Sequence, residues 1–324
     1  MIRKKNLIFG GSGFIGHHLV NFIDNKKKGD SIIYDIKEPK TKNANFERVD
    51  VRKHINTKFL PTEDSVIFNL AAVHRTPGHL SNEYFETNLL DAENICNYAR
   101  EHNINTIVFT SSIAVYGTYE EKKSENTMPM PDIPYGISKL SAEYIHKLWQ
   151  QEDPQKRKLI IIRPGVVFGE NEDGNFTRLI NSISKGTFFY PGRKDTIKAC
   201  IYVKDLVDAT FQIIDKTQKG INIYNFTYDP APSINEICSV ISQEGNLRPP
   251  KIKLPLFILL AISKVLYALT KKEGIHPDRV RKLTISNNID GKKLKNNFEL
   301  KYGLKKGILD WMKDTSFSKN KSIY

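Results

Sequence analysis

A serine, a tyrosine and a lysine in the first half of the chain have the types and spacing that proton transfer needs. Tyr135 and Lys139 lie four residues apart at the start of a predicted helix, so both side chains share one helix face. An ammonium beside a phenol favours the ionised phenol and lowers its pKa. Ser112 follows a predicted strand, where its hydroxyl can bond the same substrate oxygen. We predict that these three catalytic residues take a proton from a hydroxyl whose carbon loses a hydride.

The Tyr-x-x-x-Lys spacing is weak evidence by itself, because a lysine-rich chain produces it by chance. It occurs five times, and only Tyr135/Lys139 follows a serine-bearing strand end. The other pairs are Tyr119/Lys123, Tyr190/Lys194, Tyr267/Lys271 and Tyr302/Lys306. The alternative for Tyr135 and Lys139 is a plain helix start with a solvated lysine.

A glycine-rich turn near the N-terminus predicts a pyrophosphate site. The apolar run 7–9 breaks into this turn, and a helical pattern follows directly. Glycines allow the tight turn and the close approach of a phosphate, and the free N–H groups of the helix start face the anion. The predicted cofactor contacts are Gly10, Gly11, Ser12, Gly13, Phe14, Ile15 and Gly16. The alternative is a tight strand-to-helix turn that binds nothing.

An acidic residue in the next strand indicates which dinucleotide binds. Asp35 lies 19 positions after Gly16, where a carboxylate accepts hydrogen bonds from the adenosine ribose hydroxyls. The same carboxylate would repel the additional phosphate of NADP. We therefore predict NAD as the cofactor.

Strand and helix patterns alternate around these residues. Strands are expected at 31–35, 46–50, 66–70, 106–110 and 159–162, and helices at 83–102 and 135–151. This alternation predicts an α/β protein with a Rossmann-type, doubly wound parallel sheet. We predict an NAD-binding domain over residues 1–169 and a smaller substrate-binding domain over 170–324, with a strand near 222–226 returning to the first sheet.

The composition is that of a globular protein in a reducing compartment. Of 324 residues, 40% are apolar and 26% charged, and the three cysteines form no CxxC pair. No HExxH or similar pattern occurs, so we predict no metal site. No secretory signal and no apolar run of membrane-spanning length is present, which predicts a cytoplasmic protein.

The C-terminal part of the chain is basic and contains one apolar stretch. From Asn246 onward there are 18 lysines and arginines against six acidic residues. Interleaved aromatic residues are absent, so we predict no nucleic-acid partner. Residues 254–269 are too few to span a bilayer, but a helix flanked by lysines can lie in an anionic membrane surface, here the inner face of the cell membrane. The alternatives are burial against the second domain or in a homodimer interface.

Taken together, the motifs resemble the extended short-chain dehydrogenase/reductases, that is, the nucleotide-sugar epimerases and their relatives. Matching stretches are Gly10–Gly16, Asp35, Asp50-Val51, Asn69–Ala72, Asn88, Thr110–Gly117, Tyr135/Lys139 and Arg163–Gly169. The resemblance implies that the tyrosine is the acid/base, that the lysine binds the nicotinamide ribose and that the serine polarises the substrate oxygen. It also implies NAD contacts from Asp50, Val51, Leu70, Ala71, Ala72, Asn88, Tyr135, Lys139, Arg163 and Pro164.

The resemblance also bears on the reaction. Sugar dehydratases of the family carry Asp-Glu after the serine or threonine, whereas this chain has Ile113-Ala114. The resemblance therefore implies an NAD-dependent 4-epimerase of a diphosphate-activated hexose or N-acetylhexosamine in surface polysaccharide synthesis. The alternatives are an NAD(P)H-dependent 4-ketoreductase of a nucleotide-linked deoxysugar and a non-catalytic dinucleotide sensor. The run 161–170, Lys198 and the apolar helix are similar to epimerases of polyprenyl-diphosphate-linked N-acetylglucosamine, so both carriers are considered.

Further polar residues are predicted to bind the substrate, beside Ser112. Arg193 and Lys198 are expected to meet its diphosphate, although Lys198 stands where the family has arginine and offers a point charge instead of a bidentate fork. His74 is expected to touch nicotinamide or sugar, and Asn175 a phosphate or sugar group. The alternatives are solvated loop charges, a packed histidine and a helix cap.

Overall fold

The computed structural model describes residues 4–40, 45–74, 78–270 and 284–314, together with residues 277 and 280. The chain divides into two compact units. The first comprises Met1–Gly117, Glu125–Pro164 and Leu206–Phe226, and the second comprises Thr118–Ser124, Gly165–Asp205 and Thr227–Tyr324.

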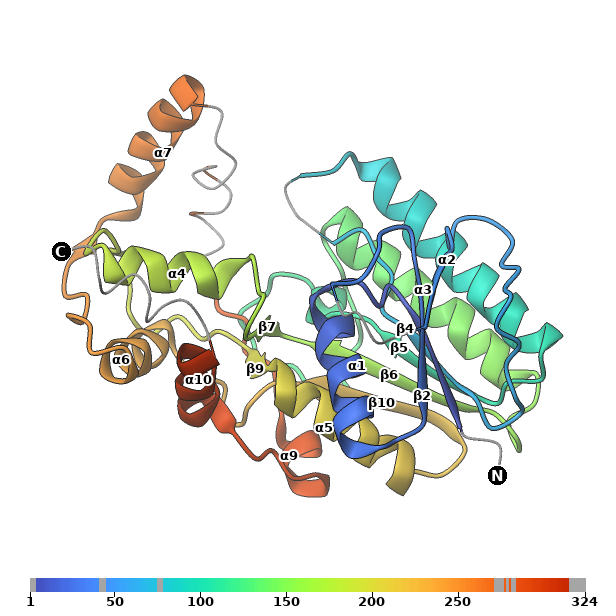
Figure 1. Ribbon diagram of the computed structural model, residues 1–324. Helices are drawn as coiled ribbons and strands as arrows, with labels where there is room; N and C mark the ends of the chain where they lie inside the picture. Colours follow the sequence, from blue (N-terminus) through green and yellow to red (C-terminus); the bar gives the residue numbers. More distant parts are fainter. Residues whose placement is uncertain are drawn as a thin grey trace. The chain divides into compact units, whose positions relative to one another are not determined.

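The first unit is built on a seven-stranded parallel sheet with the order β10-β6-β5-β4-β1-β2-β3 (Figure 1). The strands are β1 (Lys5–Phe9), β2 (Asp30–Asp35), β3 (Asn45–Arg48), β4 (Val66–Asn69), β5 (Thr106–Thr110), β6 (Lys158–Pro164) and β10 (Gly220–Phe226). The chain winds outward from β1 to β3 and then crosses to β4 on the other side of β1. This order confirms the predicted doubly wound fold, whose ligands bind where the winding reverses, at the carboxyl ends of β1 and β4.

Helices cover both faces of this sheet. On one face, α2 (Ser81–Glu101) and α3 (Pro134–Gln151) lie side by side (Figure 1). On the other face are α1 (Phe14–Lys26) and α5 (Val203–Lys216), whose Phe22 and Phe211 rings stack at 5.2 Å. Because both faces of a parallel sheet are buried, the sequences of its strands are continuous apolar runs and do not alternate between apolar and polar residues.

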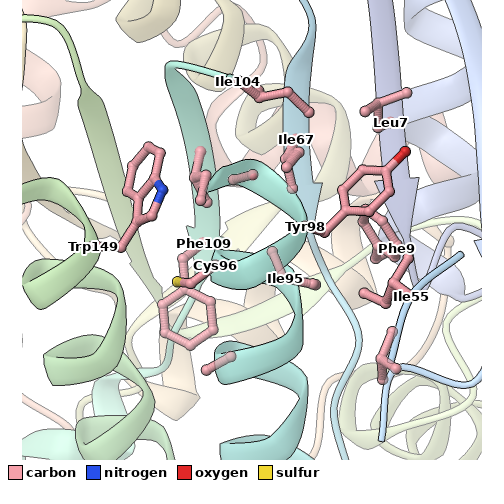
Figure 2. Close-up of a cluster of buried hydrophobic side chains, with 14 of the residues drawn as sticks. Leu7, Phe9, Ile55, Ile67, Ile95, Cys96, Tyr98, Ile104, Phe109 and Trp149 are labelled. Carbon is pink, nitrogen blue, oxygen red and sulfur yellow. The ribbon is translucent and has the colours of Figure 1, made fainter. Parts of the chain in front are cut away.

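Figure 2 shows the core that lies between the sheet and helices α2 and α3. Successive side chains of a strand point to opposite faces, so Leu7 and Phe9 of β1 enter this core together with Phe109 of β5. They meet Tyr98 of α2 and Trp149 of α3, both buried. This packing fixes α3, and with it Tyr135, relative to the ends of β4 and β5.

The second unit contains two short strand pairs and a set of helices. Strand β7 (Val166–Phe168) pairs with β9 (Cys200–Tyr202), and β8 (Tyr190–Pro191) pairs with β11 (Lys253–Leu254), both in parallel. The helices are α4 (Asn175–Ser184), α6 (Ile234–Glu244), α7 (Leu256–Thr270), α9 (Lys292–Asn297) and α10 (Gly303–Asp314). Helix α10 packs against α6 and β9.

Within the described part of the chain, every helix is too short or too polar to cross a membrane. Helix α7 is the most apolar of them and has 15 residues. Six of its large apolar side chains are exposed, namely Phe257, Ile258, Ile262, Val265, Leu266 and Leu269, and of its residues only Ser263 is buried.

Candidate active site

The glycine turn forms a cradle that only a residue without a side chain can complete. Gly10 has a φ of +79°, and a Cβ built on it would lie 2.6 Å from the backbone nitrogen of Ala71. Gly13 is the N-cap of α1, and no side-chain hydrogen bond caps this helix. The first N–H groups of α1 are therefore available to an anion.

Asp35 lies beside this turn, at the end of β2. One oxygen of its carboxylate accepts the Ser12 N–H at 3.1 Å, and the other accepts the Lys37 N–H at 3.1 Å. The Ser12 hydroxyl also donates to the Lys37 carbonyl at 2.6 Å. The structure thus brings together the glycine turn, predicted to bind a pyrophosphate, and the Asp35 carboxylate, predicted to bind a ribose. These residues fit a dinucleotide.

The segment after β4 forms the other wall of the turn. Leu70 donates its N–H to the Phe9 carbonyl at 2.9 Å, and Leu70, Ala71 and Ala72 are all half-buried. Because the backbone of Ala71 lies so close to the turn, a side chain at Gly10 has no room. Phe14 and Ile15, the first residues of α1, are half-buried too, whereas Gly11 and Gly16 are buried.

Two of the predicted NAD contacts, Asp50 and Val51, lie just after β3. Asp50 binds Arg52 through both carboxylate oxygens, at 2.9 and 2.7 Å, and this pairing lowers the pKa of Asp50. Val51 is buried, and its carbonyl accepts a hydrogen bond from Asn94 of α2 at 2.9 Å. The contact between these residues and a cofactor stays a prediction.

Two of the predicted cofactor contacts have side chains that bind other protein groups, and their contact with a cofactor stays a prediction. The Arg163 guanidinium is buried and donates to Glu143 at 2.8 and 2.6 Å and to the Tyr116 hydroxyl at 2.8 Å. The buried Asn88 amide donates to Ser138 Oγ at 2.9 Å and accepts the Val73 N–H at 3.0 Å.

These partners tie both side chains to α3, since Glu143 and Ser138 belong to this helix. Pro164, next to Arg163, is buried at the end of β6, where it pairs with Phe226 of β10.

Ser112 and Tyr135 lie together. Ser112 caps a short 3₁₀ helix, η1 (Ile113–Tyr116), where its Oγ accepts the Ala114 N–H at 3.1 Å. It lies near enough to the Tyr135 phenol to lower the pKa of that phenol. The adjacent Ser111 instead donates to Glu143 at 2.6 Å, so only one of the two serines faces the tyrosine.

The start of α3 can come this close to η1 because it contains a glycine. A Cβ on Gly136 would lie 2.4 Å from the Ala114 carbonyl oxygen. Pro134, in the first turn of α3, has the backbone angle that a helix start needs. Both features hold the half-buried Tyr135 against Ser112.

Burial raises the pKa of Tyr135 to about 12; Ser112 lowers this pKa, and the neighbouring Tyr84 raises it. Lys139 was expected to lower it as well. In the structure, the buried Lys139 ammonium lies 4.4 Å from the centre of the Phe109 ring, and the carboxylates of Asp91 and Glu143 act on it. The lysine is thus directed toward buried carboxylates, which the i, i+4 spacing alone does not reveal.

Four buried polar side chains lie behind this site and were not predicted from the sequence. Asp91 and Glu143 are both buried, as are Asn69 and His146, which contact each other at 3.4 Å. A signal was available in α3, where Glu143 and His146 fall on the helix face that also carries Ala142 and Trp149. A charged residue at such a position needs a buried partner.

In the second unit, two of the predicted substrate-binding cations lie near one acidic residue. Arg193 forms ion pairs with Glu120 at 3.2 Å and with Asp195 at 3.0 Å. The Lys198 ammonium donates to the Ile285 carbonyl at 2.7 Å. Burial lowers the pKa of Lys198 to about 8, while Glu120 raises it and Arg193 lowers it.

The structure also bears on the alternatives for His74 and Asn175. His74 is exposed just after β4, so it is not a packed core histidine. Asn175 is the first residue of α4 and is exposed, whereas the N-cap is Gly174. The helix-cap alternative is therefore wrong, and the side-chain amide oxygen of Asn175 accepts a hydrogen bond from the Arg178 guanidinium at 3.2 Å.

Comparisons with known proteins show which family the chain resembles. The family model of the NAD dependent epimerase/dehydratase family matches residues 6–226. N-acetyl-alpha-D-glucosaminyl-diphospho-ditrans,octacis-undecaprenol 4-epimerase of Escherichia coli O157:H7 is 29% identical to this chain, over 93% of it and 92% of the relative. An uncharacterized UDP-glucose epimerase of Bacillus subtilis is 31% identical, over 65% of this chain and 73% of its own.

Solved structures show the same fold. A UDP-glucose 4-epimerase of Thermus thermophilus in complex with NAD has a TM-score of 0.74 at 21% identity, covering 99% of this chain and 100% of that one. The UDP-N-acetylglucosamine 4-epimerase of Bacillus cereus has a TM-score of 0.68 at 20% identity, covering 95% and 97%. The family model spans more than half of the chain and names the predicted cofactor. The chain therefore belongs to the NAD dependent epimerase/dehydratase family, as its motifs indicated.

Proposed function

We propose that the protein is an NAD-dependent 4-epimerase of a hexose or N-acetylhexosamine carried on a diphosphate. The observation that carries this proposal is the close approach of the start of α3, with Tyr135, to the segment that carries Ser112 after β5, where a Cβ on Gly136 would lie 2.4 Å from the Ala114 carbonyl oxygen. The glycine cradle and Asp35 belong to the same compact unit. The family supports a sugar as the substrate.

Each residue has a definite task in this reaction. Tyr135 takes the proton of the C4 hydroxyl and later returns it, and Ser112 orients the same oxygen. Bound NAD supplies a reversible acceptor for the C4 hydride. With a pKa of about 12, the phenol keeps its proton at neutral pH. Its base form thus requires positive charge at the site in addition to the nearby Ser112.

The residues that follow Ser112 favour epimerisation over dehydration. Ile113 and Ala114 form the start of η1 and carry no group that could donate or accept a proton. Loss of a C6 hydroxyl needs a second acid/base pair at this place. Tyr135 alone is sufficient as the acid/base of a reaction that removes one proton from the C4 hydroxyl and later restores it.

Helix α7 supports a lipid carrier. Its side chains Phe257, Val265 and Leu269 are 72%, 59% and 77% exposed, and water disfavours so much exposed apolar surface. Lys251, Lys253 and Lys264 add positive charge. We propose that α7 lies in the surface of an anionic bilayer that holds a polyprenyl-diphosphate sugar, as the name of the Escherichia coli relative suggests. A second copy of the chain is the competing occupant.

Two substrates offered side by side test the proposal. Purified protein with catalytic NAD is incubated with UDP-N-acetylglucosamine or with polyprenyl-diphosphate-linked N-acetylglucosamine, and the galacto product is measured. We expect conversion of the lipid-linked sugar without net change in NADH. Conversion of neither substrate would refute the epimerase. Stoichiometric oxidation of NAD(P)H with a 4-keto sugar would show a ketoreductase.

A further inference from the structure

A cluster of buried charged groups lies behind Lys139. Its members are Asp91 of α2, Lys139 and Glu143 of α3, and Arg163 of β6, with exposed fractions of 1%, 1%, 0% and 2%. Two carboxylates balance two cations. Burying charges is unfavourable unless each is paired, so the pairing within the cluster decides what each member does.

Glu143 is committed to Arg163. The guanidinium contacts both of its carboxylate oxygens, at 2.8 and 2.6 Å. Ser111 donates a third hydrogen bond at 2.6 Å, and the Lys147 ammonium lies 3.6 Å away. This bidentate pairing leaves Asp91 as the carboxylate that balances the Lys139 ammonium.

Asp91 is itself held in a defined orientation. The Asn69 amide donates to one of its carboxylate oxygens at 2.9 Å and lies 3.4 Å from His146 Nε2. His146 Nδ1 donates to the Ala142 carbonyl at 2.8 Å, so Nε2 is an acceptor for the amide. Burial lowers the pKa of His146 to about 4, which keeps the ring neutral.

The second oxygen of Asp91 has no hydrogen-bond partner among the residues that the structure describes. An unpaired buried carboxylate oxygen is costly, and the nearby cation is Lys139. Burial raises the pKa of Asp91 and lowers that of Lys139, and each group partly offsets this effect in the other, since Lys139 lowers the pKa of Asp91 and Asp91 raises that of Lys139.

We propose that Asp91, oriented by Asn69 and His146, is a positioning residue that keeps the Lys139 ammonium charged and in place, one helical turn from Tyr135. The groups that face Lys139 are Asp91 on α2, Glu143 and His146 on α3 and, through Glu143, Arg163 on β6. Without the Asp91 charge, the cluster carries one excess positive charge. Lys139 then loses its proton at a lower pH.

The pH dependence of turnover tests this proposal. This test rests on the proposed function, because it assumes that turnover needs a charged Lys139. Asp91→Asn keeps the size of the side chain and removes its charge. We expect the alkaline limb of the kcat profile to move to lower pH by about one unit or more. Glu93→Gln removes one charge from an exposed position of the same helix and should leave the limb unchanged. An unmoved limb in Asp91→Asn would overturn the proposal.

A stability measurement on the protein without cofactor or substrate keeps the test independent of the reaction. Lys139→Met leaves Asp91 as an unpaired buried charge, so its urea midpoint at pH 8 should fall. Adding Asp91→Asn to this variant should restore part of the loss. If instead the two substitutions lower the midpoint additively, Asp91 does not pair with Lys139 and the proposal fails, whether or not the protein is an epimerase.

Discussion

Replacing Arg163 by methionine tests whether this residue serves the fold or the cofactor. Its guanidinium makes three hydrogen bonds of 2.6–2.8 Å, to Glu143 and Tyr116, and all three residues are at most 2% exposed. Removing it leaves the Glu143 carboxylate buried without its cation, which costs about 3–5 kcal/mol of unfolding free energy. Because the pair is buried, solvent screening does not reduce this figure.

Urea unfolding, followed by circular dichroism, measures the loss of unfolding free energy. A fluorescence titration at a urea concentration below the unfolding transition measures NAD affinity. Arg100→Met is the matched control, since Arg100 pairs with Glu152 at the surface, with side chains 35% and 43% exposed, where a pair contributes at most about 1 kcal/mol. The double variant Arg163→Met/Glu143→Gln should recover part of the loss. Unchanged stability together with weakened NAD binding in Arg163→Met would refute the reasoning and show that the residue is a cofactor ligand.

Three further predictions concern the glycine turn, the choice of cofactor and α7. Gly10→Ala places a Cβ 2.6 Å from the Ala71 nitrogen at a φ of +79°, so stability should fall by about 1–3 kcal/mol and NAD affinity with it; a titration equal to wild type would contradict the cradle. Asp35→Ser removes the charge that repels a 2′-phosphate, so the ratio of NADP to NAD affinity should rise; a constant ratio would contradict that role. Phe257→Ser with Leu269→Ser should reduce flotation with anionic vesicles, whereas unchanged flotation and a lost dimer would show that α7 binds a second copy.

Features that depend on neighbouring residues in the chain were predictable from the sequence. The parallel sheet follows from short apolar runs that alternate with helical patterns, and the glycine turn and Asp35 follow from their spacing. The proximity of Ser112 and Tyr135 was predictable because local signals mark both elements. A serine pair marks the end of β5, and a proline marks the start of α3.

Features that depend on partners distant in sequence were not predictable in the same way. Arg163 and Asn88 fall at family positions near the cofactor, yet Glu143 and Ser138 of α3 take up their side chains. The direction of the Lys139 ammonium depends on Asp91, which is 48 positions earlier in the chain and on another helix. Periodicity assigns a residue to a helix face but does not say which buried charge it meets across the helix pair.

The central claim is that the Tyr135 phenol, with Ser112 beside it, transfers the proton of the sugar hydroxyl. The most direct test is the epimerisation rate of Tyr135→Phe beside that of Tyr119→Phe, which removes a hydroxyl from another Tyr-x-x-x-Lys pair whose tyrosine is 48% exposed. The account predicts a loss of about 10²–10⁴-fold in kcat for Tyr135→Phe, with NAD affinity retained, and no loss for Tyr119→Phe. Equal rates for the two variants would contradict it.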